Sequence, residues 1–257
     1  QVKGVDEADI VKTDGKSIFL LHGQSFMVLN AWPADQLSTV ASIGIEGEPS
    51  EMFVDNGRAV VYSLVDGRPI YDAAGVKYRN EYSDYWYAYG GPGVATDVAG
   101  APSTGAYPYP GYAPQPLTKV TVLTLDGQKP SVARELYFEG NYLSSRRVGS
   151  HVRTVLQGGA HGPNLKAYFD FSQGQTPPTT VDGWIAAYNQ LRYENIAKIS
   201  GTTVSDWIPY QFAKEGGSVK ASTIACEDYY VPTAGTTQYG LTQVQSIDLG
   251  NVGALPR

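Results

Sequence analysis

Residues 17–30 read Ser-Ile-Phe-Leu-Leu-His-Gly-Gln-Ser-Phe-Met-Val-Leu-Asn, two short apolar runs with Gly23 between them. Glycine adopts positive φ without a steric penalty, so this pattern is typical of two antiparallel strands joined by a tight turn. Glu51–Asp55 and Ala59–Leu64 repeat the pattern around Asn56-Gly57, a residue pair that type I′ hairpin turns favour. The two hairpins predict an antiparallel sheet.

Further short runs with turn residues between them extend this prediction along the chain. They are Asp9–Thr13, Thr39–Ile43, Lys119–Leu125, Val132–Phe138, Tyr142–Val148, His151–Leu156, Lys220–Cys226 and Thr242–Leu249. Nothing in their spacing suggests strands that alternate with helices, as a parallel sheet requires. We therefore expect an all-β, antiparallel protein.

Two segments interrupt the strands, and we expect both to be insertions into one domain that spans residues 1–257. The first, 66–116, is rich in Tyr, Gly and Pro and should be irregular, because proline lacks the amide donor of a ladder. The second, 158–217, contains one predicted helix near Thr180–Ser200. Thr180 suits the N-cap, Asp182 suits the first turn, and Gly201 ends the helix.

Composition excludes several classes of protein. Charged residues make up 17% of the 257 residues, against about 25% in typical domains, and the net charge is −6. Such a chain lacks the clustered cations that bind nucleic acid. Cys226 is the only cysteine, which excludes an internal disulfide. The longest apolar runs fall short of the ~20 residues of a membrane-spanning helix. Because Gln1 stands where an initiator Met and a leader would, we expect a processed product or an excised piece.

Several motifs resemble those of a family of secreted bacterial and archaeal β-propellers that is distantly related to the WD-repeat proteins. The similarity begins at Gly4-Val-Asp-Glu-Ala-Asp-Ile-Val-Lys-Thr-Asp-Gly15 and continues through Lys129–Gly140, Trp207–Tyr210 and Cys226–Tyr230. The resemblance implies propeller blades and a secreted, periplasmic or cell-envelope location. It implies no catalytic residues, since the family has no established activity to transfer.

The number of predicted strands suffices for two to three blades, whereas closed propellers usually have ~4–8. We therefore expect a partial propeller, with open sheet edges that pair with a protein partner or with the remainder of the same propeller.

The aromatic residues of the first insertion are the main candidates for a binding site, because Tyr and Trp are enriched at protein interfaces. They also suit a structural lid over the sheet, and the sequence does not separate the two roles. The candidates are Tyr82, Tyr85, Trp86, Tyr87, Tyr89, Tyr107 and Tyr109.

The densest group of carboxylates is Asp6, Glu7 and Asp9, which we consider as ligands of calcium because hard cations prefer oxygen donors. Their spacing does not match a calcium-binding loop, and otherwise no cofactor is expected. The alternative is that these side chains bind neighbouring groups and hold the first strand in its sheet. The Arg146-Arg147 pair is expected to face Glu135 or Glu139 on a neighbouring strand.

These observations favour a non-enzymatic secreted binding or scaffold module that displays aromatic loops and belongs to a larger protein or complex. Two alternatives stay open. One is an extracytoplasmic hydrolase that uses paired carboxylates, with Asp170, Glu227 and Asp228 as the first candidates. The other is a calcium-stabilised structural component of the cell envelope.

Overall fold

The structure, a computed structural model, describes residues 4–76, 116–158, 161–163, 165–166, 169, 176–230, 240–251, 253 and 256. The chain divides into two compact units, which are described separately. Unit 1 comprises Gln1–Tyr78, Tyr112–Ala160 and Pro209–Arg257, and unit 2 comprises Arg79–Gly111 and His161–Ile208.

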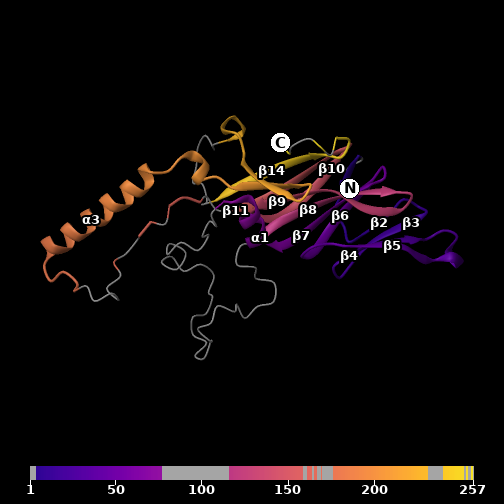
Figure 1. Cartoon of the computed structure of the whole chain (residues 1–257), viewed down its shortest axis with the longest axis horizontal. Coiled ribbons are helices and arrows are strands. Elements are labelled where there is room, and N and C mark those ends of the chain that lie inside the picture. Colours follow the sequence, from indigo (N-terminus) through magenta and orange to yellow (C-terminus); the bar gives the residue numbers. More distant parts are fainter. Residues whose placement is uncertain are drawn as a thin grey trace, which may run out of the picture. The chain divides into compact units, whose positions relative to one another are not determined.

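Unit 1 consists of three antiparallel sheets (Figure 1). Sheet 1 has the order β2-β3-β4-β5, with bounds Val11–Thr13, Ser17–His22, Ser25–Asn30 and Ser38–Gly44. Sheet 2 has the order β13-β12-β9-β8-β7-β6, with bounds Ser218–Thr223, Tyr210–Glu215, Lys129–Glu139, Pro116–Asp126, Arg58–Asp66 and Glu48–Asp55. Sheet 3 has the order β1-β10-β11-β14, with bounds Val5–Glu7, Asn141–Val148, His151–Gly158 and Leu241–Asp248.

The hairpin turns have the backbone that their sequences predict. Asn56 and Gly57, between β6 and β7, have φ values of 44° and 73°, the left-handed pair that a type I′ turn needs. The turn between β8 and β9 has the same character at Gly127 and Gln128, with φ values of 54° and 68°. Strands β3 and β4 begin and end at the predicted residues.

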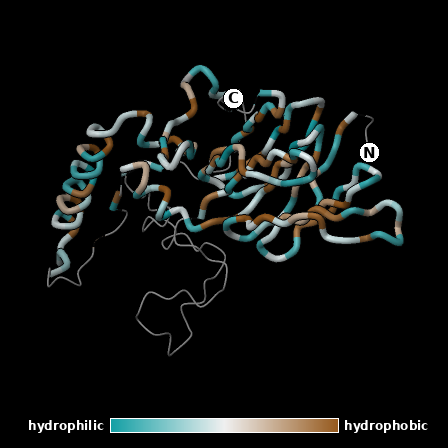
Figure 2. The backbone as a smooth tube through the Cα atoms, turned by 45° about the vertical axis from the view of Figure 1, so that its right-hand side comes forward, coloured by the Kyte–Doolittle hydropathy of each residue, from teal (hydrophilic) through white to brown (hydrophobic). Residues whose placement is uncertain are grey.

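Sheet 2 contributes to the core on both of its faces, because its strands alternate two sets of apolar side chains. On β7, Val60 and Tyr62 face strands β11 and β14 of sheet 3, whereas Ala59 and Val61 face strands β3 and β4 of sheet 1. All four side chains are fully buried. Figure 2 shows hydrophobic residues running through these strands. The two apolar layers thus hold the three sheets together.

Helix α1 (Arg68–Ala74) is a departure from the expectation of one inserted helix, since it lies at the start of the segment predicted to be irregular. Pro69 in its first turn and Gly75 at its C-cap, with φ of 67°, are ordinary helix boundaries that the proline and glycine content of the segment obscured. Ile70 and Tyr71 are buried against Val65, Leu117, Tyr137 and Phe212.

Two strands were not expected from the sequence. Strand β1 is only three residues long, and β12 falls inside the second predicted insertion. Besides these and helix α3 (Val181–Ser200), the described residues form three short 3₁₀ helices, η1 (Ala34–Gln36), η2 (Val204–Asp206) and η3 (Cys226–Asp228).

The fold is all-β and propeller-like, as expected, and its sheets do not close within the described residues. Each sheet ends in two outer strands, which are β2 and β5, β13 and β6, and β1 and β14. Among the described helices, none has the length and hydropathy needed to cross a membrane.

Candidate binding groove on helix α3

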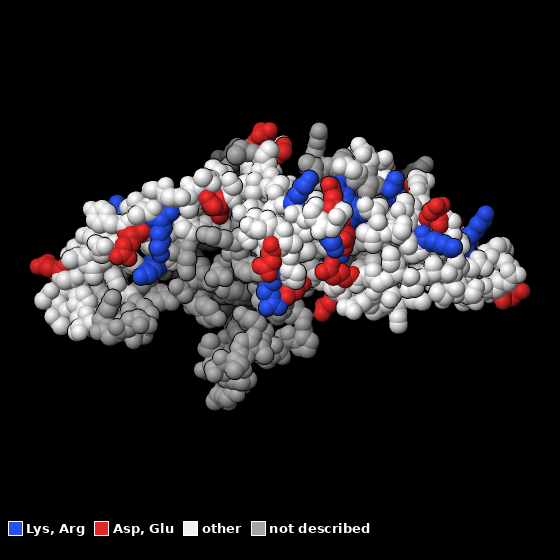
Figure 3. Space-filling view, viewed as in Figure 1, with Lys and Arg blue, Asp and Glu red and all other residues white. Residues whose placement is uncertain are grey.

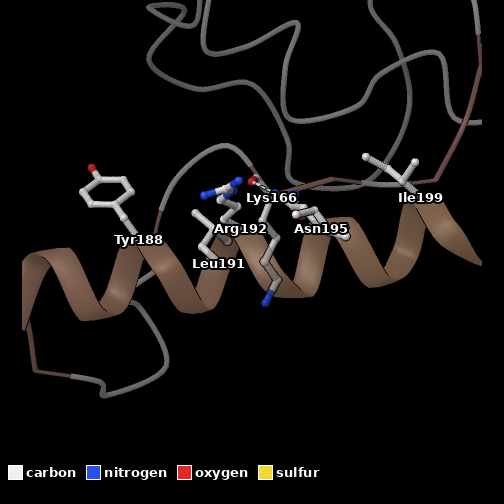
Figure 4. Close-up of a pocket in the computed structure, with 7 residues that line it drawn as sticks. Lys166, Tyr188, Leu191, Arg192, Asn195 and Ile199 are labelled. Atoms are coloured by element: carbon white, nitrogen blue, oxygen red, sulfur yellow. Dashed lines mark hydrogen bonds between the residues drawn. The ribbon is translucent and has the colours of Figure 1, made fainter.

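Unit 2 contains helix α3 (Val181–Ser200), where the described residues form an open groove with a volume of about 370 Å³ (Figure 4). One wall is Lys166, from the segment before the helix. The remaining lining comes from α3 and consists of Tyr188, Leu191, Arg192, Asn195, Ile196 and Ile199. We refer to these seven residues as the α3 groove.

Helix α3 forms where the sequence predicts it, for the predicted reasons. The Thr180 hydroxyl oxygen accepts a hydrogen bond from the Gly183 amide at 3.1 Å, and Asp182 lies in the first turn. At the other end, the Gly201 amide donates to the Ala197 carbonyl at 3.2 Å. The helix therefore begins and ends on its own local interactions.

The groove is bounded by a segment that runs antiparallel to α3, which we call the strap (described residues 161–163, 165–166 and 169). The Lys166 amide donates to Asn195 Oδ1 at 3.1 Å, and Asn195 Nδ2 donates to the Lys166 carbonyl at 2.7 Å. One side-chain amide thus makes both hydrogen bonds that a neighbouring strand would make. The Phe169 ring lies edge-on to Trp184 and Tyr188, with centroids 5.9 and 4.9 Å apart.

The strap and its surroundings cover only one side of the helix. Leu191 is buried at 8% exposure, and Trp184 and Asn195 are partly covered. The adjacent side follows the three- and four-residue spacing of one helical face and is apolar but uncovered. Its members are Val181 (75% exposed), Ile185 (55%), Tyr188 (56%), Ile196 (45%) and Ile199 (42%). We call these five residues the apolar face of α3.

The charges at the groove are all positive. Lys166 and Arg192 are exposed, and neither has an ion-pair partner in the part of the chain that the structure describes. In Figure 4, Arg192 lies between Tyr188 and Ile199 along the helix. The nearest carboxylate on α3, Glu194, accepts a hydrogen bond from Gln190 Nε2 at 3.0 Å and lies two residues from Arg192, on another side of the helix.

The seven aromatic residues that the sequence nominates for binding, Tyr82 to Tyr109, lie outside the described residues, so their role stays a prediction. The sequence did not indicate the groove, because Lys166 and Asn195 are 29 residues apart and neither belongs to a motif.

The predicted calcium ligands are held by cations and by backbone in unit 1. Asp6 accepts from Lys12 Nζ at 2.9 Å and lies 3.4 Å from Arg147 Nε, and Glu7 lies 3.1 Å from Arg146. Asp9 Oδ1 accepts from the Ile10 amide at 2.7 Å. Across the described ranges, no group of three or more His, Cys, Asp or Glu side chains is placed to hold a metal ion.

These contacts correct the partners expected for the arginine pair. Arg146 and Arg147 face Glu7 and Asp6 on β1, and Arg147 also lies 3.2 Å from Asp55, so neither faces Glu135 or Glu139. The reason is sheet order, because β1 pairs with β10 and places the N-terminal acids opposite the arginines. The acids thereby hold the first strand in its sheet.

Two further carboxylates, Glu46 and Glu135, converge on the buried ammonium of Lys119. Lys119 Nζ lies 2.6 Å from Glu46 Oε2 and also contacts Glu135 Oε1, while Tyr137 donates to Glu46 at 3.1 Å. Burial raises the pKa of the Glu135 carboxyl, but hydrogen bonds from Lys119 and Lys214 outweigh it and hold that pKa below its ordinary value. Both carboxylates thus serve an ion-pair cluster, which we call the Lys119 cluster.

The carboxylates nominated for hydrolysis do not form a comparable pair. Glu227 and Asp228 are both exposed on η3, and Asp170 lies outside the described residues. A Ser–His–Asp grouping exists at Ser150, His151 and Asp248, where Ser150 Oγ lies 3.2 Å from His151 Nδ1. A hydrogen bond from Ser150 lowers the pKa of Asp248, so the serine lies between the other two groups. A catalytic triad needs the histidine in that position.

A second buried polar network joins sheets 2 and 3. The Tyr62 hydroxyl lies 2.6 Å from Thr154 Oγ1, and the Tyr142 hydroxyl lies 2.6 Å from Ser145 Oγ and donates to Glu51 at the same distance. Burial raises the pKa of Tyr62 to about 12, and burial together with Glu51 raises the pKa of Tyr142. Protonated phenols of this kind connect the two sheets.

Charges elsewhere on the visible face are mixed in sign, with acidic and basic side chains often adjacent (Figure 3). No match to the chain was found among curated proteins or among solved structures. The family model described as a β-propeller domain matches residues 1–255, almost the whole chain, in agreement with the antiparallel sheets and their two shared core layers. The chain belongs to the β-propeller domain family.

Proposed function

We propose that this propeller domain is a secreted, non-enzymatic binding module for protein, and that the α3 groove with the apolar face of α3 is its contact surface. One observation supports this most strongly. Helix α3, which is capped at its N-terminus by Thr180, exposes five large apolar side chains beside two cations that have no ion-pair partner among the described residues. Aromatic side chains and arginine are the residue types enriched at interfaces and their hot spots.

The scaffold suits such a role, since propellers belong to the binding and scaffold class of modules at the level of the fold. The three sheets of unit 1 are joined to one another by shared apolar layers. Each described sheet also ends in two outer strands, and sheet edges are places where another chain can pair, which supports placing the domain in a larger protein or complex. The Tyr-rich segment 66–116 remains a second proposed contact region.

The rival class, a carboxylate-dependent hydrolase, has less support from the described residues. Glu46 and Glu135, two described carboxylates that share one cation, contact Lys119 and are bordered by Tyr137. A hydrolytic carboxyl pair needs a cleft that admits substrate between the two groups. Here a buried ammonium occupies that position.

The test is partner capture with matched variants of the full chain. The double variant Ile185→Ser/Ile196→Ser removes two side chains of the apolar face, and Leu143→Ser removes a similarly exposed apolar side chain (54%) from β10, an inner strand of sheet 3, as a control. Extracellular and envelope proteins of the source cells are captured on each, and any protein that the double variant loses is purified and titrated by calorimetry. We expect affinity at least tenfold weaker for the double variant, about 1.4 kcal/mol, with the control unchanged. If no captured protein distinguishes the variants, the proposed surface is wrong.

A further inference from the structure

The α3 groove has a charge and shape that identify one class of partner. We propose that it takes an acidic, amphipathic polypeptide segment, whose aliphatic or aromatic side chains pack on the apolar face of α3 while its carboxylates pair with Lys166 and Arg192. This inference rests on the proposed function and adds the chemistry of the partner to it.

The described polar groups of the groove are few, and the charged ones are both cations. Asn195 is engaged at both atoms of its amide by the Lys166 backbone, and Tyr188 contributes only a hydroxyl. The remaining polar groups of the described lining are the Lys166 ammonium and the Arg192 guanidinium, and no described carboxylate lines the groove. Two like charges without counter-ions favour an anionic ligand, because burial of an unpaired charge in an interface is costly.

These cations differ from those that stabilise unit 1. Lys119, Arg146 and Arg147 each have carboxylate partners within 3.4 Å. Their carboxylates come from neighbouring strands or loops of the same unit. At the α3 groove the described residues supply no carboxylate to Lys166 or Arg192, and in our proposal the acidic partner comes from another molecule.

The length of the apolar face matches a polypeptide segment better than a small ligand. The apolar face of α3 extends from Val181 to Ile199, 18 residues along the helix, or about 27 Å at 1.5 Å per residue. A small ligand is usually enclosed in a pocket that buries most of its surface. An open groove that continues into a stripe of this length instead matches a polypeptide with apolar residues at helical spacing. The floor residue Leu191 and the strap bound this surface on one side.

The experiment uses the full chain and three labelled synthetic peptides of about 18 residues, the length of the stripe. The first carries leucine at helical spacing with glutamate elsewhere, the second replaces every glutamate by lysine, and the third replaces every leucine by serine. Fluorescence anisotropy gives the affinities at about 50 mM and about 300 mM salt, where the screening length differs more than twofold. We expect the first peptide to bind at least tenfold more tightly than the others, and more weakly at the higher salt.

Charge variants locate the site. Arg192→Glu and Lys166→Glu should each weaken binding of the acidic peptide several-fold, and together at least tenfold, because each replaces a cation that pairs with the peptide by an anion. Both residues are exposed, so we expect the fold to be retained. Lys220→Glu, at an exposed lysine of β13, makes the same charge change in unit 1 and should alter binding less than twofold. Circular dichroism confirms that α3 is retained in each.

Three results would overturn the inference: equal binding of the acidic and basic peptides, equal losses in Arg192→Glu and Lys220→Glu, or a dimer of the chain that Ile185→Ser/Ile196→Ser dissociates. The last would show that a second copy occupies the face. If the natural partner depends on Ile185 and Ile196 but is indifferent to Arg192→Glu, the acidic partner is excluded while the binding function stands.

Discussion

Replacement of Lys119 by methionine tests whether the Lys119 cluster stabilises the fold. The Lys119 side chain is 3% exposed, and Met has a similar length but no charge. The substitution leaves Glu135, at 18% exposure, with Lys214 as its remaining cation, 3.0 Å away. Loss of one partner of a buried ion pair costs about 3–5 kcal/mol. Because Glu46 is 48% exposed and returns to water, and Lys214 remains, we expect a smaller cost of about 2–3 kcal/mol, at or just below the lower end of that range.

The cost of Lys119→Met should depend on pH, and the pKa of Glu135 gives the direction of that dependence. A carboxyl whose folded pKa lies below its unfolded value contributes stability above the unfolded pKa, and that stability is lost as the pH falls through the folded pKa. Glu135 is such a group, and Lys119 is one of the two cations that lower its pKa. The difference in unfolding free energy between wild type and Lys119→Met should therefore be greatest near pH 7 and shrink below about pH 4.3, the ordinary glutamate value.

Urea denaturation at neutral and acidic pH measures the loss of unfolding free energy in Lys119→Met and its change with pH. Lys214→Met, at a lysine that is 39% exposed, is the control and should cost no more than about 1 kcal/mol. The double variant Lys119→Met/Glu135→Leu should recover much of the loss, because it removes the uncompensated buried carboxylate as well. A cost for Lys119→Met below that of the control, or one that does not change with pH, would refute the reasoning.

Three further predictions concern unit 1. Gly47→Ala should lower the free energy of unfolding by more than about 2 kcal/mol, since φ is 82° and the added Cβ would overlap the Leu64 carbonyl and lie 2.6 Å from Val65 Cγ1. Thermal denaturation measures the loss, and Gly44→Ala, whose added Cβ would have no atom within 4 Å, is the control. The raised pKa of Tyr62, about 12, predicts stability that is intact below pH 10 and falls as pH rises towards 12, and Tyr62→Phe should lessen that fall in alkaline denaturation. Calcium and chelator should leave the melting temperature unchanged, because Asp6 and its neighbours are already engaged; a calcium-dependent rise would revive the calcium-stabilised alternative.

Local sequence signals predicted much of unit 1. Asn56-Gly57 specified its hairpin because few residue pairs adopt two successive left-handed conformations, and the structure has both. Alternating apolar residues predicted most strands within a few residues. Strand β1 escaped prediction because three residues carry too little pattern. It is held by pairing with β10, more than a hundred residues away, which no local signal reports.

The ends of helix α3 could be predicted from the sequence, but the side chains that it leaves exposed could not. Thr180 and Gly201 are local signals, and the helix begins and ends as they predict. Which apolar side chains are covered depends on the strap, and the strap depends on the contact between Lys166 and Asn195. An asparagine in a helix ordinarily indicates only an exposed position. Its role as a clamp on extended backbone becomes visible only when both segments are placed.

The role of each cation also depends on contacts that only the structure shows. By residue type alone, Arg146, Lys119 and Arg192 are equivalent, and the sequence singled out the Arg146-Arg147 pair because its members are adjacent. The structure separates the three by their partners, because Arg146 and Lys119 are neutralised by carboxylates of their own unit. Arg192 has no such partner among the described residues and lies beside exposed Ile196 and Tyr188. A charge that the described fold leaves without a counter-ion, next to apolar surface that it leaves uncovered, is available to a ligand, and on this ground the binding surface is assigned to α3.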